Sequence, residues 1–350
     1  MGKTLVTGAT GFVGASLVRK LLDDGQEVRV TTRSASDERN LQGLDIERVT
    51  ADVRDAAAIG RAVQGCEAVY HAAAKVAFWV PLRERREFYD VNVAGTRNVL
   101  AAALRSGVSR VIYTSSVSAI GCHDDGKLTS EEDHYTLWDK GTDYEHSKLA
   151  AEFEVWRFAA RGLPVVAVLP TAPVGWMDRS PNPVGRIILD FLARKLPAID
   201  GGVNLIDVED VAAGHLLAAK HGRLGERYIL GHQNLTMAQV FGALEQVSGV
   251  AAPRVKAPYR LALGAAHVLQ FVADHVTNRH PLFTPPMVKM AAVNYYVDTG
   301  KAERELGFRP RSTPAQGVVR AIRWFLDNGY VRLGERERQG IRARLEAAGA

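Results

Sequence analysis

The chain has 350 residues, of which 47% are hydrophobic and 24% are charged, and its formal net charge is +5. A chain of this length and composition can bury one large α/β unit and a smaller lobe, as an ordinary globular protein does. No run of eighteen apolar residues occurs, which excludes a membrane-spanning helix. Basic residues do not alternate with aromatic ones as nucleic-acid binding would require, so we expect no nucleic-acid partner.

The first predicted element is an apolar strand that runs into three glycines spaced three residues apart, Gly8, Gly11 and Gly14. A helix with apolar periodicity follows over residues 11–22. Gly8 permits a tight turn, Gly11 lets a ligand approach the backbone, and Gly14 lets the helix pack on the strand. Because the helix N-terminus offers unpaired N–H groups and the positive end of the helix dipole, the segment predicts a pyrophosphate site for a dinucleotide.

Strands and helices then alternate up to residue 170. Strands are expected at residues 4–7, 28–32, 48–50, 68–71, 111–114 and 165–169. The helices between them are expected at residues 11–22, 56–63, 88–106 and 144–160. This alternation predicts an α/β fold with a doubly wound parallel sheet, which binds ligands at the carboxyl ends of its strands. Thr7, His71, Ser116 and Leu169 are expected to end strands and to meet at that edge.

The end of the second strand carries no acidic residue that would bind a ribose 2′-hydroxyl and repel a 2′-phosphate. Arg33 stands there instead, with Thr32 and Ser34 beside it. A guanidinium can hold a phosphate through two parallel hydrogen bonds. The sequence therefore favours NADP over NAD, while leaving both open.

Tyr144 and Lys148 lie four residues apart at the start of a predicted helix, and so on one face of it. A nearby ammonium favours the phenolate of a tyrosine, as does the positive charge of an oxidised nicotinamide. The pair follows the strand at residues 111–114 and the two hydroxyls of Ser115 and Ser116. This position favours proton exchange with a substrate hydroxyl over the alternative of two surface residues.

Seven segments of the chain resemble the extended short-chain dehydrogenases/reductases, the group that includes NAD-dependent epimerases and dehydratases. The matching segments are residues 7–14, 69–74, 92–100, 113–117, 144–148, 207–212 and 301–308. The resemblance spans residues 1 to about 330. It is greatest to the branch of dihydroflavonol reductases, 3β-hydroxysteroid and sterol-4-carboxylate dehydrogenases and hopanoid-associated sugar epimerases. It implies a Rossmann fold with a smaller C-terminal substrate lobe and a nicotinamide cofactor, and it leaves the substrate open.

The resemblance also implies roles for individual residues. Tyr144 would exchange the hydroxyl proton, and Lys148 would lower the pKa of Tyr144 and hold the nicotinamide ribose. Ser116 would bind the reacting oxygen of the substrate, with Ser115 as the alternative. The cofactor site would further include Gly8, Thr10, Gly11, Phe12, Val13, Gly14, Arg33, Asp52, Val53, Ala72, Ala73, Ala74, Pro170, Thr171 and Val174. Local packing is an equal alternative for four candidate substrate contacts, Lys75, Phe78, Trp79 and Trp176.

Prolines and glycines become frequent after Pro170 and predict a looped second lobe. By resemblance, residues 1–170 form the NAD(P)-binding domain and residues 171–330 the substrate lobe, with a segment near 203–215 returning to the first domain. Residues 331–350 form a basic C-terminal tail, expected as a solvated helix. Residues 259–276 predict an apolar helix, followed by the apolar segment 281–287. This helix either packs on its own domain or serves as a lid or membrane anchor near a lipid-like substrate.

The two cysteines, Cys66 and Cys122, lack metal-ligand or redox spacing, so we expect a reducing compartment and no metal. The sequence begins directly with a strand rather than a secretory signal, which favours the cytoplasm. Peripheral contact with the inner face of a membrane is a further expectation. By resemblance, a homodimer would form through the helices at residues 88–106 and 144–160.

The leading hypothesis is reversible hydride transfer between NAD(P) and a secondary alcohol or ketone of a hydrophobic, sterol-like substrate. Carbon dioxide would be lost if a carboxyl group lay β to the new ketone. The alternative is a sugar or nucleotide-sugar epimerase, although the loop at residues 169–175 lacks the Asn that nucleotide-sugar enzymes of this group usually carry there. A third interpretation, a cofactor-sensing regulator, is disfavoured because such relatives have lost the Tyr/Lys pair.

Overall fold

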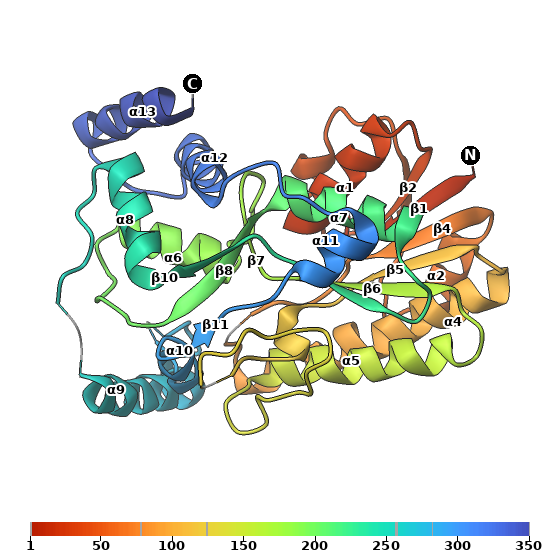
Figure 1. The fold of residues 1–350 in the computed structure, drawn as a ribbon, viewed down its shortest axis with the longest axis horizontal. Coiled ribbons are helices and arrows are strands. Elements are labelled where there is room, and N and C mark those ends of the chain that lie inside the picture. The colour runs from red at the N-terminus through yellow and green to blue at the C-terminus, as the bar shows by residue number, and fades with distance from the viewer. Residues whose placement is uncertain (1, 78, 124, 256–257, 282, 350) are drawn as a thin grey trace.

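Seven parallel strands form the central sheet of the first lobe, in the order β3-β2-β1-β4-β5-β6-β9 (Figure 1). The computed structural model describes residues 2–77, 79–123, 125–255, 258–281 and 283–349. The strands are β1 (Lys3–Thr7), β2 (Val28–Thr32), β3 (Glu47–Thr50), β4 (Cys66–His71), β5 (Arg110–Thr114), β6 (Val165–Pro170) and β9 (Arg227–Leu230). The strand order turns back at β1, between β2 and β4, and sheets of this kind bind ligands beside such a point.

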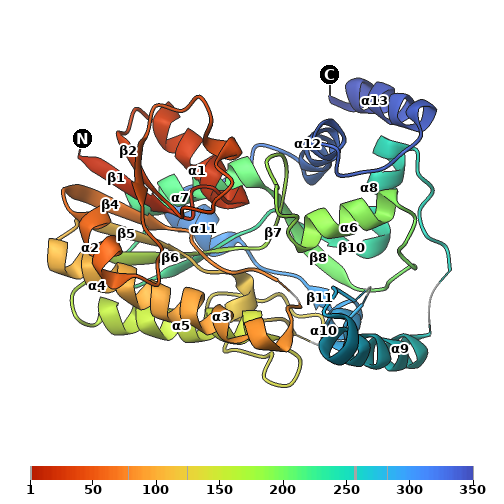
Figure 2. The ribbon, with the colours of Figure 1, turned by 180° about the vertical axis from the view of Figure 1, so that it is seen from behind.

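Helices cover both faces of this sheet (Figures 1 and 2). On one face lie α1 (Phe12–Asp23), α7 (Val208–His221) and α11 (Gly300–Leu306), which share an apolar core with the strands. The other face is covered by α2 (Ala56–Val63), α4 (Thr96–Ser106) and α5 (Asp143–Ala159). Because the strands are covered on both sides, their residues form near-continuous apolar runs, and every residue of β6 is buried.

The six predicted strands and four predicted helices of this lobe are present, with ends shifted by at most two residues. The helix expected at residues 88–106 begins earlier, as α3 (Arg86–Tyr89), and passes through a π-helical turn (Asp90–Gly95) into α4. β9 is absent from the sequence prediction. Three short 3-10 turns complete the lobe, at Arg39–Leu41, Leu82–Glu84 and Val117–Ala119.

The second lobe is built on a smaller sheet of four strands, in which β8 pairs with β7, β10 and β11. Its strands are β7 (Ala172–Val174), β8 (Gly202–Asp207), β10 (Gln233–Thr236) and β11 (Asn294–Tyr295). Its core helices are α6 (Pro183–Leu192), α8 (Met237–Ser248), α12 (Pro314–Asp327) and α13 (Glu335–Gly349). In the segment near 203–215, which is expected to return to the first lobe, β8 pairs within the smaller sheet but adds Ile206 to the first lobe's core, and α7 packs on the central sheet, as α11 also does.

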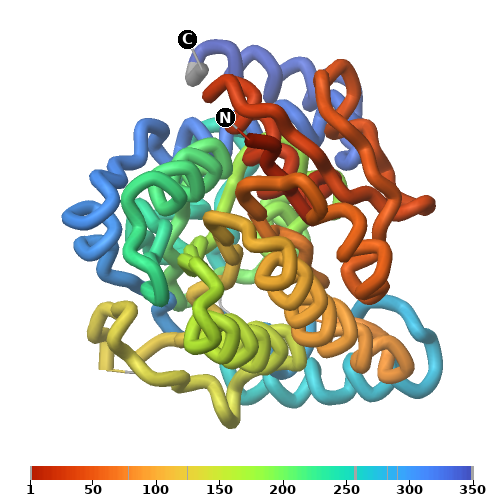
Figure 3. Tube along the Cα trace, turned by 90° about the vertical axis from the view of Figure 1, so that its right-hand side faces the viewer, coloured from red at the N-terminus to blue at the C-terminus, as the bar shows by residue number. Residues whose placement is uncertain are grey.

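The expected basic tail is likewise a packed element. α13 buries Ile341 and Leu345 in the core shared with α8 and α12, because these two residues lie on one face of an otherwise polar helix. At the opposite edge of the molecule lie α9 (Tyr259–Val272), a π-helical turn (Ala273–Thr277) and α10 (Pro285–Met290) (Figures 1 and 3). Within the described ranges, no helix combines the length and the apolar character that crossing a bilayer requires.

Candidate active site

The glycine loop after β1 has the shape that a dinucleotide needs. Gly8 has a left-handed backbone (φ +74°), and a Cβ there would lie 2.6 Å from the Ala73 backbone. A Cβ on Gly14 would lie 2.1 Å from the carbonyl oxygen of Gly8, so the helix can approach the loop only without a side chain. At Gly11, the N-cap of α1, an added Cβ would have one described neighbour within 4 Å, the same Gly8 carbonyl oxygen at 3.2 Å. Its surface and the unpaired N–H groups of α1 can therefore accept a pyrophosphate.

Thr10, Phe12 and Val13 are partly buried around this loop, as expected for neighbours of a bound pyrophosphate. The next loop, Ala72–Ala74, continues from β4 and lies beside Gly8, where the Ala72 N–H donates to the carbonyl of Thr7 at 3.2 Å. The two loops at the carboxyl ends of β1 and β4 are thus locked together. The residues that the sequence assigned to the diphosphate side of the cofactor therefore lie at one edge of the sheet.

His71, the last residue of β4, connects this edge of the sheet to α4 through hydrogen bonds. Thr96 donates its hydroxyl proton to the carbonyl of Asn92 at 2.6 Å, so the His71 Nε2–H donates to Thr96 Oγ1 at 2.9 Å. His71 Nδ1 must then accept from the Thr7 hydroxyl at 2.7 Å. Burial, with a smaller effect of the Lys148 charge, lowers the pKa of His71 to about 3. The imidazole is therefore neutral and joins β1, β4 and α4.

Tyr144 and Lys148 are positioned by the cap of α5. Thr142 caps the helix with its hydroxyl and the Glu145 carboxylate closes a capping box, so Tyr144 lies in the first turn and Lys148 in the next. The Lys148 ammonium donates to the carbonyl of Thr114 at 2.8 Å and lies 5.0 Å from the centre of the Tyr113 ring. Both side chains are buried at the end of β5.

Burial controls the pKa of Tyr144 in the protein by itself. Burial raises the pKa of Tyr144 to about 12, a hydrogen bond with the Ser116 side chain opposes part of this rise, and the charge of Glu145 adds to it. The lowering of this pKa by Lys148 stays a prediction. Burial also lowers the pKa of Lys148 itself to about 8, against the attraction of Glu152. The structure therefore brings Ser116 and Tyr144 together, with a buried cation behind them.

Ser115 points the other way. Its hydroxyl donates to Glu152 Oε1 at 2.5 Å, and Glu152 Oε2 accepts from Arg227 on β9 at 3.0 Å. Burial raises the pKa of Glu152, while Arg227 and Ser115 act in the opposite direction. Sequence analysis missed Glu152 and Arg227, because nothing in the local pattern predicts that α5 faces β9.

Asn92 is a further residue that the sequence did not single out by itself. The π-helical turn aims its amide at the loop after β4, where Nδ2 donates to the Lys75 carbonyl at 3.0 Å and to Ser147 Oγ at 2.9 Å. Its Oδ1 accepts from the Lys75 N–H at 2.7 Å. Asn92 thus ties this loop to the helix that carries Tyr144. Regular helical periodicity could not predict this, since the π turn shifts the helix face.

The expected contacts on the adenosine side are only partly available. Arg33 is exposed after β2. Hydrogen bonds with Arg54 and with Lys75 lower the pKa values of Asp52 and Glu87, respectively, and the charge of Arg33 adds a small effect to each. The Asp52 carboxylate is held by Arg54 through hydrogen bonds of 3.0 and 2.7 Å, which use part of its acceptor capacity. Val53 packs against Gly95, where an added Cβ would lie 2.7 Å from the Val53 side chain.

The residues expected beside the nicotinamide, between Pro170 and Val174, lie at the end of β6 and in β7. Pro170 ends β6, but the Thr171 hydroxyl donates to Asn204 Oδ1 at 2.9 Å, and Val174 is buried in the core of the second lobe. Val174 is buried where β7 pairs with β8, whereas Thr171 is only partly buried, and the cofactor contacts expected of this segment stay a prediction.

The candidate substrate contacts do not form one wall. Lys75 pairs with Glu87 and Trp79 donates to Asp274 Oδ1 at 2.9 Å, whereas Trp176 donates to Glu209 on α7 and lies over Arg19 on α1. Trp176 is therefore held against α1 and α7, whereas Lys75 and Trp79 are held by Glu87 and Asp274. Phe78 lies outside the described residues.

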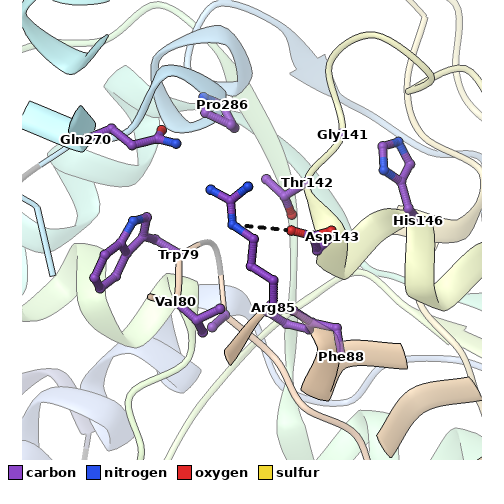
Figure 4. A pocket seen from close by; sticks show the side chains of 11 residues that line it. Trp79, Val80, Arg85, Phe88, Gly141, Thr142, Asp143, His146, Gln270 and Pro286 are labelled. Carbon is purple, nitrogen blue, oxygen red and sulfur yellow. Dashed lines mark ion pairs between the residues drawn. The ribbon is translucent and has the colours of Figure 1, made fainter. Parts of the chain in front are cut away.

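A pocket of about 290 Å³ lies between the first lobe and the α9–α10 segment (Figure 4). Val80 and Phe88, two of its lining residues, also pack on Tyr144. The Arg85 side chain extends into it and lies 3.7 Å from Asp143. Its other lining residues are Ala77, Trp79, Gly141, Thr142, His146, Gln270 and Pro286. In the part of the chain that the structure describes, no three His, Cys, Asp or Glu residues gather as a metal site would need.

A glycine loop after β1 and a buried Tyr–Lys pair beside β5 are the arrangement of a short-chain dehydrogenase/reductase, an NAD(P)-dependent oxidoreductase. Residues 4–231, well over half of the chain, match the model of the NAD dependent epimerase/dehydratase family. The chain belongs to this family, whose members are extended short-chain dehydrogenases/reductases.

Similar proteins cover nearly the whole chain. A dihydroflavonol 4-reductase-like protein of Synechocystis is 42% identical over 93% of this chain and 95% of its own length. The sterol demethylase protein B of Methylococcus capsulatus is 39% identical over 94% of this chain and 99% of its own. The crystal structure of gox2253 is similar with a TM-score of 0.83 and 36% identity, over 94% of this chain and 99% of that one.

Proposed function

We propose that this protein transfers a hydride between NAD(P) and a secondary alcohol or ketone on a hydrophobic, sterol-like substrate. The observation that carries the proposal is the burial of Ser116, Tyr144 and Lys148 together after β5, at the carboxyl edge of the same parallel sheet that carries the glycine loop after β1. Lys148 lies one helical turn from Tyr144 and places a buried cation behind both hydroxyls.

The roles of these residues follow from their proton states. When bound, NAD(P) supplies or accepts the hydride. Tyr144, with its pKa raised to about 12, is protonated at neutral pH and can give its proton to a ketone oxygen. Ser116 donates a hydrogen bond to the same oxygen and stabilises the charge that develops there. In the reverse direction Tyr144 takes a proton, and the Lys148 ammonium favours the phenolate while holding the nicotinamide ribose.

Three observations support a hydrophobic substrate. Val80 and Phe88 join Tyr144 to a pocket, so apolar surface reaches the proposed proton donor. The loop after β6 has no Asn, and its Thr171 hydroxyl is used by Asn204, which leaves that loop poor in groups for a nucleotide diphosphate. The 39% identical relative is named as a sterol demethylase protein. A coupled loss of carbon dioxide is part of the proposal where the substrate carries a carboxyl β to the ketone.

NADP is the proposed preferred cofactor. Arg33 is exposed at the end of β2, where a 2′-phosphate would lie in a Rossmann fold, and Arg54 neutralises the carboxylate of Asp52 nearby. Among the described residues, no hydrogen bond or ion pair engages the Arg33 guanidinium. It is therefore available for a phosphate.

The test follows NAD(P)H absorbance when purified protein meets a 3-hydroxysterol, with or without a 4-carboxylate, or the corresponding ketone. We expect net reduction or oxidation with the sterols, faster with NADP(H) than with NAD(H). Tyr144→Phe should reduce the rate at least a thousandfold. The matched variant Tyr89→Phe, which removes a partly exposed hydroxyl at the far side of Asp143, should keep it.

A panel of nucleotide sugars serves as the counter-test. Sugar isomers that form without net change in NAD(P)H, together with no reaction of the sterols, would replace the proposal by an epimerase. Equal rates for Tyr144→Phe and the unaltered protein would contradict the proposed proton transfer, whatever the substrate.

A further inference from the structure

The outer face of α9 and the π-helical turn after it is apolar and exposed. We define the α9 face as Leu261, Val268, Phe271, Val272 and Val276. Four of these side chains, all but Val272, are between 61% and 70% exposed. Val268 follows Leu261 by seven residues, Phe271 and Val272 follow Val268 by three and four, and Val276 follows Val272 by four. This spacing places the five side chains along one side of the helix. Over this same stretch the helix buries only Ala266 and Ala273. An apolar patch of this kind on a protein surface indicates an interaction site.

The segment that carries the α9 face is mainly basic. Between Glu245 and Asp298 the sequence has five basic residues and one acid, Asp274, a formal charge of +4. Arg254, Arg260 and Arg279 are exposed. Asp274 is turned inward and its side chain is only 7% exposed, because Oδ1 accepts from Trp79 Nε1 at 2.9 Å and Oδ2 lies 3.6 Å from the Arg85 guanidinium. The outer surface of this segment thus combines apolar side chains with exposed arginines.

We propose that the α9 face binds the surface of an anionic lipid bilayer, with α9 lying in the plane of the interface. Apolar side chains on one side of a helix enter the boundary between headgroups and acyl chains, and flanking arginines are attracted by anionic headgroups. A second copy of this chain fits less well, because a two-fold contact through the α9 face would bring two groups of positive charges together.

The position of α9 suits this partner. α9 lies along one edge of the molecule, with α10 on its inner side, so a flat surface can reach the α9 face without meeting the two sheets (Figures 1 and 3). The inner side of the same segment supplies Gln270 and Pro286 to the pocket next to Tyr144 (Figure 4). Docking would therefore set this pocket next to the bilayer. Binding of the bilayer by the α9 face does not depend on the reaction proposed above.

The experiment is vesicle flotation with the full chain, using vesicles of phosphatidylcholine alone or with one third phosphatidylglycerol. We expect at least tenfold tighter binding to the anionic vesicles and weaker binding at high salt. Leu261→Ser/Phe271→Ser and Arg260→Gln/Arg279→Gln should each weaken binding at least tenfold. The matched controls Leu224→Ser and Arg309→Gln change exposed residues elsewhere and should bind within twofold of the unaltered protein. Thermal unfolding of every variant establishes that it is folded.

Two results would overturn the proposal. The first is a folded, unaltered protein that binds neither kind of vesicle, or binds them equally well with and without the α9-face substitutions. The second is a dimer in analytical ultracentrifugation that Leu261→Ser/Phe271→Ser converts to a monomer, without vesicle binding by either protein. That second result would assign the α9 face to contact between two copies of the chain.

Discussion

The hydroxyl of Ser115 donates to the buried carboxylate of Glu152 at 2.5 Å, while Oγ of the next residue, Ser116, accepts from the Ser118 N–H at 3.1 Å and lies near Tyr144. Two adjacent serines thus serve different structures, because successive side chains of an extended backbone point in opposite directions. Ser115 belongs to the ion pair between α5 and β9, and Ser116 faces the proposed reacting oxygen.

This division predicts opposite effects of two alanine substitutions. Ser116→Ala should lower kcat tenfold to a thousandfold, as expected on loss of a donor to a developing oxyanion, and change the free energy of unfolding by less than about 1 kcal/mol. Ser115→Ala should retain most of kcat but cost about 1–3 kcal/mol of stability, because Glu152 loses a buried hydrogen bond. Steady-state rates and urea unfolding of both variants test this. A large loss of kcat in Ser115→Ala alone would reverse the assignment.

The glycine loop makes a prediction about packing. Gly14→Ala places a Cβ 2.1 Å from the Gly8 carbonyl oxygen, which is backbone and cannot move aside, so we expect a loss of about 3 kcal/mol or more. It should also abolish NAD(P) binding, measured by the quenching of protein fluorescence. Gly264→Ala is the matched control, since no atom lies within 4 Å of a Cβ there and the helix α9 should gain about 0.5–1 kcal/mol. Equal stability of the two variants would contradict the close approach of α1 to the loop.

Arg33 predicts the cofactor preference. Arg33→Ala should raise the KM for NADP at least tenfold, the effect of losing a charged hydrogen bond of about 1.5–3 kcal/mol, and leave the KM for NAD within twofold. The control is Arg39→Ala, because the Arg39 guanidinium is already held by Asp37. A parallel rise in both KM values for Arg33→Ala would show that this arginine does not discriminate between the cofactors.

Asp178 predicts how stability depends on pH. This carboxyl is buried, and burial raises its pKa from 3.8 to about 7. Between about pH 4 and pH 7 the folded protein therefore binds this proton more tightly than the unfolded chain does, so the free energy of unfolding falls as pH rises through this range, by at most about 4 kcal/mol. Asp178→Asn keeps an acceptor for the Asn182 N–H and removes the titration.

Guanidinium unfolding between pH 4 and pH 8 distinguishes the two proteins. The unaltered protein should lose stability relative to Asp178→Asn across the range and be the less stable of the two at pH 8. Parallel curves would mean that Asp178 ionises as it does in the unfolded chain.

Local sequence patterns determined the first lobe. The glycine spacing at residues 8–14 and the alternation of strands and helices up to residue 170 depend on neighbouring residues alone, so they predicted the parallel sheet, the pyrophosphate loop and the shared helix face of Tyr144 and Lys148. The Rossmann fold and the family were predicted for the same reason, since their motifs are short and ordered along the chain.

Only the tertiary structure decided what lies between distant segments. β9, β10 and β11 have two to four residues each, too few for a period to emerge, and they are fixed by pairing with strands far away in the sequence. The pairing of β7 with β8 buried Val174 in the second lobe, the Thr171 hydroxyl bonds to Asn204 on β8, and the approach of α5 to β9 placed Glu152 beside Ser115. Burial set the pKa of Tyr144 above its ordinary value, because desolvation depends on all the surrounding elements and not on the residues beside it in the chain.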